Sequence, residues 1–203
     1  MSSKDPLLMN WDELNILRES AVDLVRQYKT DGDKEKVRKW CDYFGFVMCL
    51  IYEYGWKDAE AIVGIVPFKD GLDDKAVNLD INGETYRERV EKQVEAGSLD
   101  GVLRIIDTEA HRDYNTAVYD CGMRYEEAEA TVKGKGAKNS PSLRKKWYTM
   151  RDNRVRDTHD YLEGAVVGLD DRFYTYDGDS ARFPGDFALP ENNVNCRCFV
   201  ALM

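Results

Sequence analysis

The stretch "LDGVLRIIDTEAHRDYNTAVYDCG", residues 99–122, repeats its apolar side chains with the period of a helix. One side of that helix gathers Leu99, Val102, Leu103, Ile106, Ala110, Tyr114, Ala117 and Cys121. The other side gathers Arg104, Thr108, His111, Arg112, Asn115 and Tyr119, with Glu109 at the rim. The apolar side predicts a long central helix. The polar side mixes more residue types than a plain Lys and Glu surface, so a solvated face and a functional face both stay open.

Upstream of this helix the sequence predicts a helical hairpin. Asn10 followed by Glu13 indicates a helix N-terminus, and helical spacing continues to the "TDGD" turn at residues 30–33. Asp33 opens a second helix, which Gly55 is placed to stop. A third, shorter helix is expected over residues 57–64.

The turn-rich segment 67–83 is the predicted linker between two parts of the chain. Helical spacing then resumes at Glu84 and ends at Gly97, and Ser98 can cap the central helix. We therefore divide the chain into a helical N-terminal module, residues 1–75, and a C-terminal domain, residues 76–203.

The last third of the sequence predicts a compact unit of mixed structure. After an exposed loop at residues 133–141, a helix is expected to run through residues 142–164. Beyond Gly164, short segments rich in Val, Phe and Tyr are separated by Gly, Asp and Pro, which is typical of strands. The predicted fold class is α+β: a helical N-terminal part, a long central helix, and a C-terminal unit in which a helix packs on short antiparallel strands.

Composition indicates a globular protein. The 203 residues include 43% apolar side chains and carry a formal net charge of −9. Neither a signal peptide nor the roughly 20 apolar residues of a membrane helix can be found, so we expect a soluble protein made in the cytoplasm, with no membrane partner. The five cysteines are odd in number and lack a secretory context, which predicts reduced thiols.

Positive charge is concentrated in one stretch of this acidic chain. Residues 133–156 contain nine basic side chains and one acidic side chain, Asp152. Lys and Arg bind phosphates independently of base sequence, so the stretch is a candidate for DNA contact. Its basic residues are Lys133, Lys135, Lys138, Arg144, Lys145, Lys146, Arg151, Arg154 and Arg156.

Asp152, Arg156 and His159 would share one face of the helix expected over residues 142–164, because they are spaced by four and then three positions. Such a set could orient a general base or hold a phosphate. A structural ion pair on a charged helix explains the same spacing, and both interpretations stay open.

The segment "NCRC", residues 195–198, allows metal binding, redox chemistry or simple packing. In a regular strand Cys196 and Cys198 point to the same face, about 7 Å apart. They could share a zinc ion only if the strand bends, and a structural zinc site needs four ligands. His159 or His111 could supply one ligand. Packing of buried thiols on a terminal strand is the simplest expectation.

Signatures of common enzyme classes are absent from the sequence. It contains no Gly-x-Ser-x-Gly elbow, and "VKGKGAKNSP" lacks the Lys-Ser end of a phosphate-binding loop. These absences weigh against NTPases, dehydrogenases and hydrolases.

Five segments in this order resemble the phage Mu F-like minor head protein family, also called the phage head morphogenesis family. They are "INGETYRERV" (81–90), "DTEAHRDYNTAVYD" (107–120), "KKWYTMRDNRVRDTHDYLEGAVVGLDDRFY" (145–174), "FPGD" (183–186) and "NCRC" (195–198). The resemblance covers residues 80–199, a little over half of the chain. The matching positions are Thr108, Glu109, Arg112, Asn115, Trp147, Asp152, Arg156, His159, Gly164, Phe173, Pro184, Gly185, Asp186, Asn195, Cys196, Arg197 and Cys198.

The resemblance implies a virion protein present in few copies inside the head. Its expected partners are the portal protein, the major capsid or scaffold protein, and phage DNA bound non-specifically during head assembly and genome delivery. The family implies no established catalytic reaction, and we expect no cofactor, with zinc as the alternative. Residues 1–75 match no known pattern and are a candidate module for portal or capsid contact.

Within that family pattern, "NCRC" becomes the last strand of a head-protein domain. Its thiols are then expected to pack inward, and Arg197 to pair with a carboxylate, with Asp152 and Glu109 as the candidates.

A small phage-borne enzyme is the alternative function. Arg104, Thr108 and Glu109 together with His159 could form a site directed at a nucleotide or RNA. ADP-ribosyltransferases and ribonucleases are the classes to consider, because both can be built from Arg, Glu and His without a metal.

Overall fold

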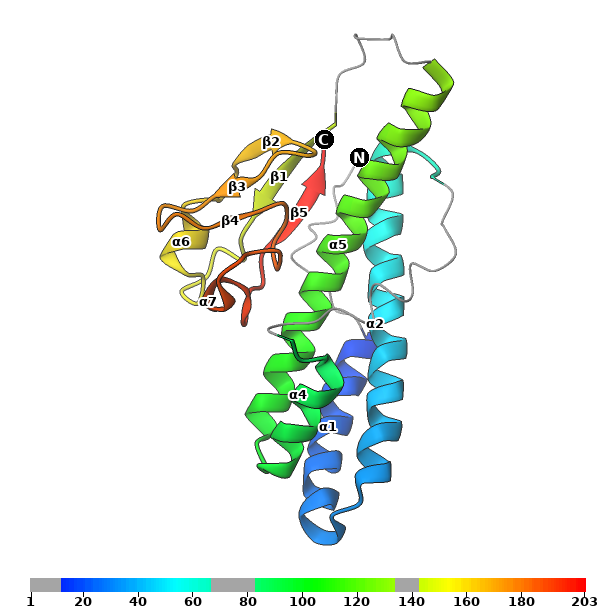
Figure 1. Cartoon of the computed structure of the whole chain (residues 1–203), viewed down its shortest axis with the longest axis vertical. Helices are drawn as coiled ribbons and strands as arrows, with labels where there is room; N and C mark the ends of the chain where they lie inside the picture. The colour runs from blue at the N-terminus through cyan, green and yellow to red at the C-terminus, as the bar shows by residue number, and fades with distance from the viewer. Residues whose placement is uncertain (1–11, 67–82, 134–142) are drawn as a thin grey trace.

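The computed structural model describes residues 12–66, 83–133 and 143–203. Long helices lie along one another in an elongated bundle, and a small unit with strands lies against one side of the central helix, α5 (Figure 1). The predicted α+β class is confirmed. The bundle consists of α1 (Asp12–Asp31), α2 (Lys34–Val63), α4 (Tyr86–Glu95) and α5 (Leu99–Lys133).

α1 and α2 form the predicted helical hairpin. Gly32 between them adopts a φ of 62°, and the Asp33 carboxylate caps α2 by accepting hydrogen bonds from the backbone N–H groups of Glu35 and Lys36. The apolar side chains of both helices face each other and α5, with Leu17 and Phe44 fully buried. The helix cap predicted at Asn10 lies outside the described residues.

The structure corrects the predicted end of the second helix. α2 continues through Gly55 to Val63, so the short helix expected over residues 57–64 is the last part of α2. A Cβ atom added at Gly55 would lie 2.4 Å from the backbone carbonyl oxygen of Tyr114 in α5. Gly55 therefore permits the close approach of α2 and α5 and does not end a helix.

α4 and α5 begin with the side-chain caps that their sequences supply. The Thr85 hydroxyl accepts from the Glu88 N–H, and the Glu88 carboxylate accepts from the Thr85 N–H, which is a complete capping box. Ser98 caps α5 as predicted, because its Oγ accepts the N–H of Gly101 at 3.1 Å. The linker predicted over residues 67–83 lies almost entirely outside the described residues, and the division at residues 75 and 76 stays a prediction.

The apolar side of α5 is buried in the bundle, as its periodicity predicts. Val102, Ile106, Ala110, Ala117 and Cys121 have no exposed surface. They pack mainly on α2, with α1 and α4 covering the first half of α5.

The C-terminal unit is built on a small antiparallel sheet with the strand order β2-β1-β5. β1 pairs with β5 through Lys145 to Tyr148 and with β2 through Arg144 to Lys146. A second sheet pairs β3 with β4. The elements are β1 (Arg144–Tyr148), α6 (Asp157–Asp160), β2 (Val166–Gly168), β3 (Phe173–Tyr174), β4 (Ser180–Ala181), α7 (Pro190–Asn193) and β5 (Phe199–Leu202).

The helix expected over residues 142–164 is wrong. Its first part is strand β1, and only Asp157–Asp160 is helical. Burial along β1 alternates, with Lys145 and Trp147 fully buried, and neighbours on both sides satisfy its backbone. The tertiary pairing with β5 and β2 determines the structure of this segment.

Trp147 lies at the centre of the C-terminal unit. Its ring packs edge-on against the rings of Phe173, Phe187 and His159, at centroid distances of 5.1, 5.8 and 5.8 Å. This aromatic cluster is the main apolar core of a unit whose strands are short. In the described part of the chain, no helix is both long and apolar enough to cross a membrane.

Candidate functional site

The polar side of α5 is buried against the C-terminal unit. Thr108, Arg112, Asn115 and Tyr119 are all less than 9% exposed, although each lies on the side that sequence periodicity assigns to polar residues. Arg104, near the start of the helix, is exposed. The interpretation of this side as a solvated face is therefore wrong for most of its length.

Glu109 is held between two arginines. One carboxylate oxygen accepts from Arg89 of α4 at 2.7 Å, and the other accepts from Arg112 one turn along α5. The Glu109 side chain is 3% exposed and that of Arg112 is 7% exposed. Each of these charges is buried with an opposite charge, which a buried ion requires.

Asn115 joins α5 to the last strand. Its side-chain amide donates to the carbonyl oxygen of Cys198 at 3.0 Å, and its side-chain oxygen accepts from the N–H of Val200 at 2.8 Å. Two turns earlier on α5, the Thr108 hydroxyl accepts a hydrogen bond from the N–H of Asn195 at 3.1 Å. Side chains of α5 thus hydrogen-bond to the backbone of residues 195–200, as a neighbouring strand would do in a sheet.

Arg197 pairs with Asp152, as predicted. Two guanidinium nitrogens of Arg197 lie 2.9 and 2.7 Å from the two carboxylate oxygens of Asp152. The hydrogen bonds from Arg197 hold the pKa of Asp152 well below its usual range. Glu109, the other candidate partner, is bound to Arg89 and Arg112 instead.

Asp152, Arg156 and His159 do not share a helix face, which corrects the set proposed from their spacing. Asp152 lies in a turn after β1, and Arg156 is the residue before α6, where it donates to the carbonyl oxygen of Val194. His159 points from α6 into the core of the unit. Residues 149–156 are not helical, so the spacing of these three residues does not bring them to one face.

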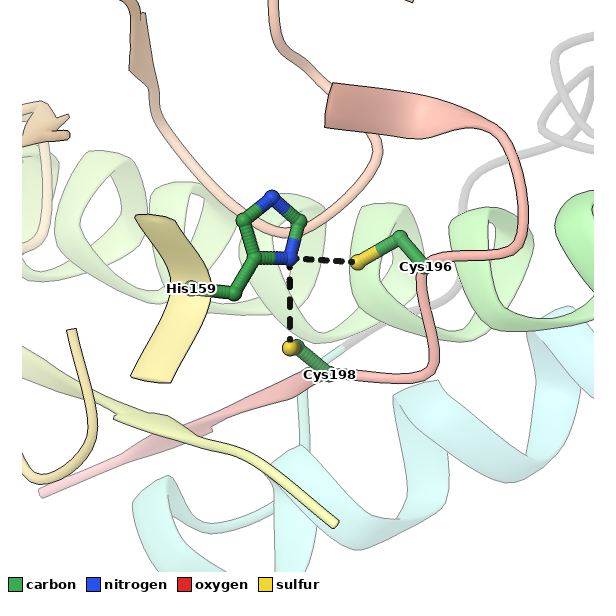
Figure 2. Close-up of side chains that lie close together, drawn as sticks. All are labelled: His159, Cys196 and Cys198. Carbon is green, nitrogen blue, oxygen red and sulfur yellow. Dashed lines mark hydrogen bonds between the residues drawn. The ribbon is translucent and has the colours of Figure 1, made fainter. Parts of the chain in front are cut away.

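His159, Cys196 and Cys198 converge on one point (Figure 2). The His159 Nδ1 atom lies 3.5 Å from the Sγ atom of Cys196 and 3.5 Å from the Sγ atom of Cys198. The three atoms all lie within 4.8 Å of one another, and each residue is less than 5% exposed. The three side chains form the cluster that we call the thiol-imidazole cluster.

The backbone before β5 is bent, and this bend brings the two thiols together. Asn195 has a φ of 57°, in the left-handed region that Asn tolerates better than most residues. The strand expected from Cys196 onward begins only at Phe199. Cys196 and Cys198 are therefore not part of a regular strand. Their thiols both point to His159.

The pKa values of the two thiols in the cluster are shifted in opposite directions. The hydrogen bond from Cys198, with a further one from His159, holds the pKa of Cys196 well below its usual range. The pKa of Cys198 is raised by the same contact with Cys196 and by burial. Like charges at this distance cannot both form cheaply in a buried site, so one thiol ionises at the expense of the other.

His111 lies close to the cluster without being part of it. Its Nδ1 atom is 2.8 Å from the carbonyl oxygen of Asp107, and burial lowers its pKa while the nearby Cys196 opposes that shift. Of the two histidines that the sequence offered, His159 is the one that reaches the thiols.

The His159 ring is oriented by aromatic side chains. It stacks on Phe187, at a centroid distance of 5.1 Å and an angle of 19°, and meets Trp147 edge-on. Its Nε2 atom is buried and has no hydrogen-bond partner among the described residues. The stacking aims Nδ1 at the two sulfur atoms (Figure 2).

A pocket connects the thiol-imidazole cluster with the surface. Its empty volume is about 210 Å³, including the part open to solvent. Three arginines give the pocket a positive lining above His159 and Cys198. The lining residues are Met150, Arg154, Val155, Arg156, His159, Asn195, Arg197 and Cys198.

The "PGD" turn of the family pattern packs on α5 beside the Glu109 ion pairs. Gly185 has a φ of 96°, and a Cβ atom there would lie 2.9 Å from Cγ of Arg112. Asp186 accepts two hydrogen bonds from the Arg182 guanidinium group and one from the backbone N–H of Arg182. Pro184, Gly185 and Asp186 thus shape a turn that covers Arg112.

Lys145 must be removed from the DNA-binding candidates. It is fully buried, and its ammonium group donates to the carbonyl oxygen of Leu169 and lies over the rings of Tyr119 and Phe173. Burial lowers its pKa to about 8. No phosphate can reach this side chain in the folded protein.

The remaining basic residues have different surroundings. Arg144 is exposed and Lys146 half-buried on the outer face of β1, while Arg151 pairs with Glu163 and Arg154 with Asp152. Lys135 and Lys138 lie outside the described residues, and only the backbone of Lys133, the last residue of α5, is described. DNA contact by these residues stays a prediction.

The enzyme candidates have separate partners. The exposed Arg104 donates to the carbonyl oxygen of Asp100, Glu109 is bound by Arg89 and Arg112, and His159 contacts the thiols. Within the described ranges, no hydrogen bond or ion pair joins Arg104, Glu109 and His159.

Two functional positions were missed from sequence. Arg89 supplies half of the Glu109 contact from α4, where it looked like one of several surface charges. Asp179 accepts from the backbone N–H groups of Ser180, Ala188 and Leu189 and from the Asn192 side chain. Only its place in the turn-forming "DGDS" segment hinted at such a role.

Comparison with known proteins gives three findings. The model of the family described as "Phage Mu protein F like protein" matches residues 75–201. "Minor head protein GP7" of Bacillus phage SPP1 is 27% identical over 77 residues, which cover 38% of this chain and 25% of that protein. "NAD(+)--arginine ADP-ribosyltransferase EFV" of Enterococcus faecalis (strain ATCC 700802 / V583) is 34% identical over 119 residues, which cover 57% of this chain and 22% of that protein.

The matched segments are therefore about a quarter or less of the length of these two relatives. No solved structure matches the chain.

Proposed function

The chain belongs to the phage Mu protein F-like family, as its five segments predicted, and from this membership we propose that it acts as a minor head protein of a tailed phage or prophage. The observation that carries the proposal is the family match over residues 75–201. This range contains α4, α5 and the C-terminal unit, including every residue of the buried contact around Glu109 and Asn115. The similarity to a phage minor head protein supports the same role.

The proposed partners are the portal protein and the major capsid or scaffold protein, in the interior of the head. α1 and α2 lie outside the family match, and they carry large apolar side chains that face solvent. Phe46 is 59% exposed and Ile62 is 58% exposed on α2, and Ile16 is 53% exposed on α1. Such side chains support a role of the N-terminal helices in contact with another head protein.

Purified particles test this function. The chain should be present in heads from an induced lysate, and a tagged copy should co-purify with the portal protein encoded by the same phage. Phe46→Glu together with Ile62→Glu should reduce that co-purification at least tenfold, whereas Lys39→Glu on the same helix should not. Heads that assemble normally without the chain, and never contain it, would contradict the proposal.

Contact with packaged DNA is the second part of the proposed role. Arg144 and Lys146 lie on the outer face of β1 and remain candidates after Lys145 is excluded. Phosphate contacts should weaken steeply as salt rises. Changing Arg144 and Lys146 to Ala should weaken binding of the chain to duplex DNA and flatten its salt dependence, while Lys34→Ala on the far end of the bundle should change neither. Binding that is absent, or that ignores salt, would remove DNA from the list of partners.

An enzymatic role is favoured by one observation, the similarity to a protein named as an ADP-ribosyltransferase. The shared segment covers 22% of that protein, so its transferase activity need not lie in the shared part. NAD hydrolysis and RNA cleavage by the unaltered chain, compared with Glu109→Gln and His159→Gln, decide the question. Activity lost in both variants at a temperature at which both remain folded would establish an enzyme, and equal background in all three would end that candidate.

A further inference from the structure

The thiol-imidazole cluster has the spacing of a metal site. Zinc binds Cys sulfur at about 2.3 Å and His nitrogen at about 2.0 to 2.1 Å, and tetrahedral geometry then places sulfur and nitrogen about 3.5 Å apart. The two observed distances from His159 Nδ1 to the sulfur atoms are both 3.5 Å. All three ligand atoms lie within 4.8 Å of one another, as one shared ion requires.

The donor set of the cluster suits a divalent cation. Cys196 and Cys198 are both buried, and two thiolates side by side in a buried site repel each other strongly. A divalent ion with two thiolates and a neutral imidazole has no net charge, so burial costs it little. Binding would displace both thiol protons to solvent. Two cysteines and a histidine are the soft and borderline ligands that favour zinc over magnesium or calcium.

The ligands are held in place before any metal binds. Asn115 fixes the carbonyl of Cys198, the N–H of Cys196 donates to the carbonyl of Asn193 at 3.0 Å, and Phe187 stacks on the His159 ring. The left-handed backbone at Asn195 turns both thiols to the same point. A preorganised set of ligands loses little conformational entropy when it binds an ion.

A fourth ligand would come from the side of the pocket. The pocket reaches His159 and Cys198, so water or a small anion can approach the ion from that side. Arg154, Arg156 and Arg197 line the approach and would favour an anionic fourth ligand. Three protein ligands with water in the fourth position are established for catalytic zinc, and the same fourth ligand would complete the four that a structural ion needs.

We propose that Cys196, Cys198 and His159 bind one zinc ion, which ties the segment before β5 to α6. The ligands come from positions 37 and 39 residues apart in sequence, in a unit with short strands and a small aromatic core. The ion acts as a cross-link that the folded chain has and the unfolded chain lacks, so it stabilises the C-terminal unit.

Zinc itself is the probe. The full chain, purified under reducing conditions and freed of metal, should bind one equivalent of zinc against a chromophoric competitor. Removing zinc with a chelator should lower the melting temperature by roughly 10 °C, and returning it should restore the original value. Cobalt in place of zinc should give the thiolate charge-transfer and ligand-field bands of a tetrahedral site.

Variants assign the ligands. Cys198→Ser and His159→Gln should each weaken zinc binding at least tenfold and change the cobalt spectrum, whereas Cys49→Ser in α2 should alter neither. If a ligand variant fails to fold, the chelation experiment on the unaltered chain decides alone. Metal below a tenth of an equivalent with unchanged melting, or a Cys196–Cys198 disulfide in protein purified without oxidants, would overturn the proposal.

Discussion

The side of α5 that faces α2 and the side that faces the C-terminal unit are both buried, and they are buried by different means. Towards α2, apolar side chains and Gly55 allow close packing of two helices. Towards the C-terminal unit, Glu109 and Asn115 use charge pairs and amide hydrogen bonds. Apolar packing tolerates many residues of suitable volume, whereas a buried polar contact depends on each partner being present.

The largest loss of stability is expected where a buried charge network loses one member. Glu109→Ala would remove the buried carboxylate that pairs with both Arg89 and Arg112. Removing one partner of a buried pair costs about 3 to 5 kcal/mol. Urea unfolding should show this decrease, and Arg104→Ala on the exposed part of the same helix should stay within about 0.5 kcal/mol. A loss below about 1 kcal/mol for Glu109→Ala would show that the network is not essential.

The apolar side should respond most strongly at Gly55. A Val side chain there would collide with the Tyr114 carbonyl, so the two helices must move apart. Overpacking of this kind costs about 1 to 3 kcal/mol. Thermal unfolding of Gly55→Val measures it, with Lys57→Val as the control for a β-branched residue in an exposed part of α2. Equal melting of the two variants would contradict the close crossing of α2 and α5.

A loss of similar size is expected for Asn115→Ala. The change removes one acceptor and one donor from α5 and leaves the carbonyl of Cys198 and the N–H of Val200 buried without these partners. Unsatisfied buried groups cost about 1 to 3 kcal/mol. Denaturant unfolding should place the effect near the middle of this range, and Glu127→Ala in the exposed part of α5 should have almost none.

The smallest effect concerns pH and the pair of Asp152 with Arg197. Because Arg197 lowers the folded-state pKa of Asp152, the pair stabilises the fold above the usual aspartate pKa of about 4. That stability is lost as the pH falls towards the lower folded-state value. Unfolding curves from pH 6 down to pH 2 should fall less steeply for Asp152→Asn than for the unaltered chain. Parallel curves would mean that the pair does not survive in solution.

The sequence predicts one side of this comparison better than the other. The helical period of residues 99–121 shows in advance which side chains enter the bundle, because apolar burial leaves a periodic signal. The buried polar side leaves no such signal. Arg112 and Asn115 look the same in sequence whether water or the C-terminal unit covers them, and the family resemblance singled them out without giving their partners.

The errors in the C-terminal unit have the same physical origin. The segment "RKKWY" falls in the helix predicted over residues 142–164, and its position between β2 and β5 makes it a strand. The meeting of His159 with Cys196 and Cys198 depends on the left-handed backbone at Asn195, which no spacing rule predicts. The prediction that Arg197 pairs with a carboxylate is confirmed, and of its two candidates, Asp152 and Glu109, the partner is Asp152.

Hydrogen exchange tests most directly the claim that α5 holds the C-terminal unit by its polar side. In Asn115→Ala, peptides from β5 and β1 should exchange faster than in the unaltered chain, while peptides from α2 and from the first half of α5 should keep their protection. Faster exchange throughout the bundle, or unchanged exchange in β5, would contradict the claim that the two sides of α5 are held by separate interactions.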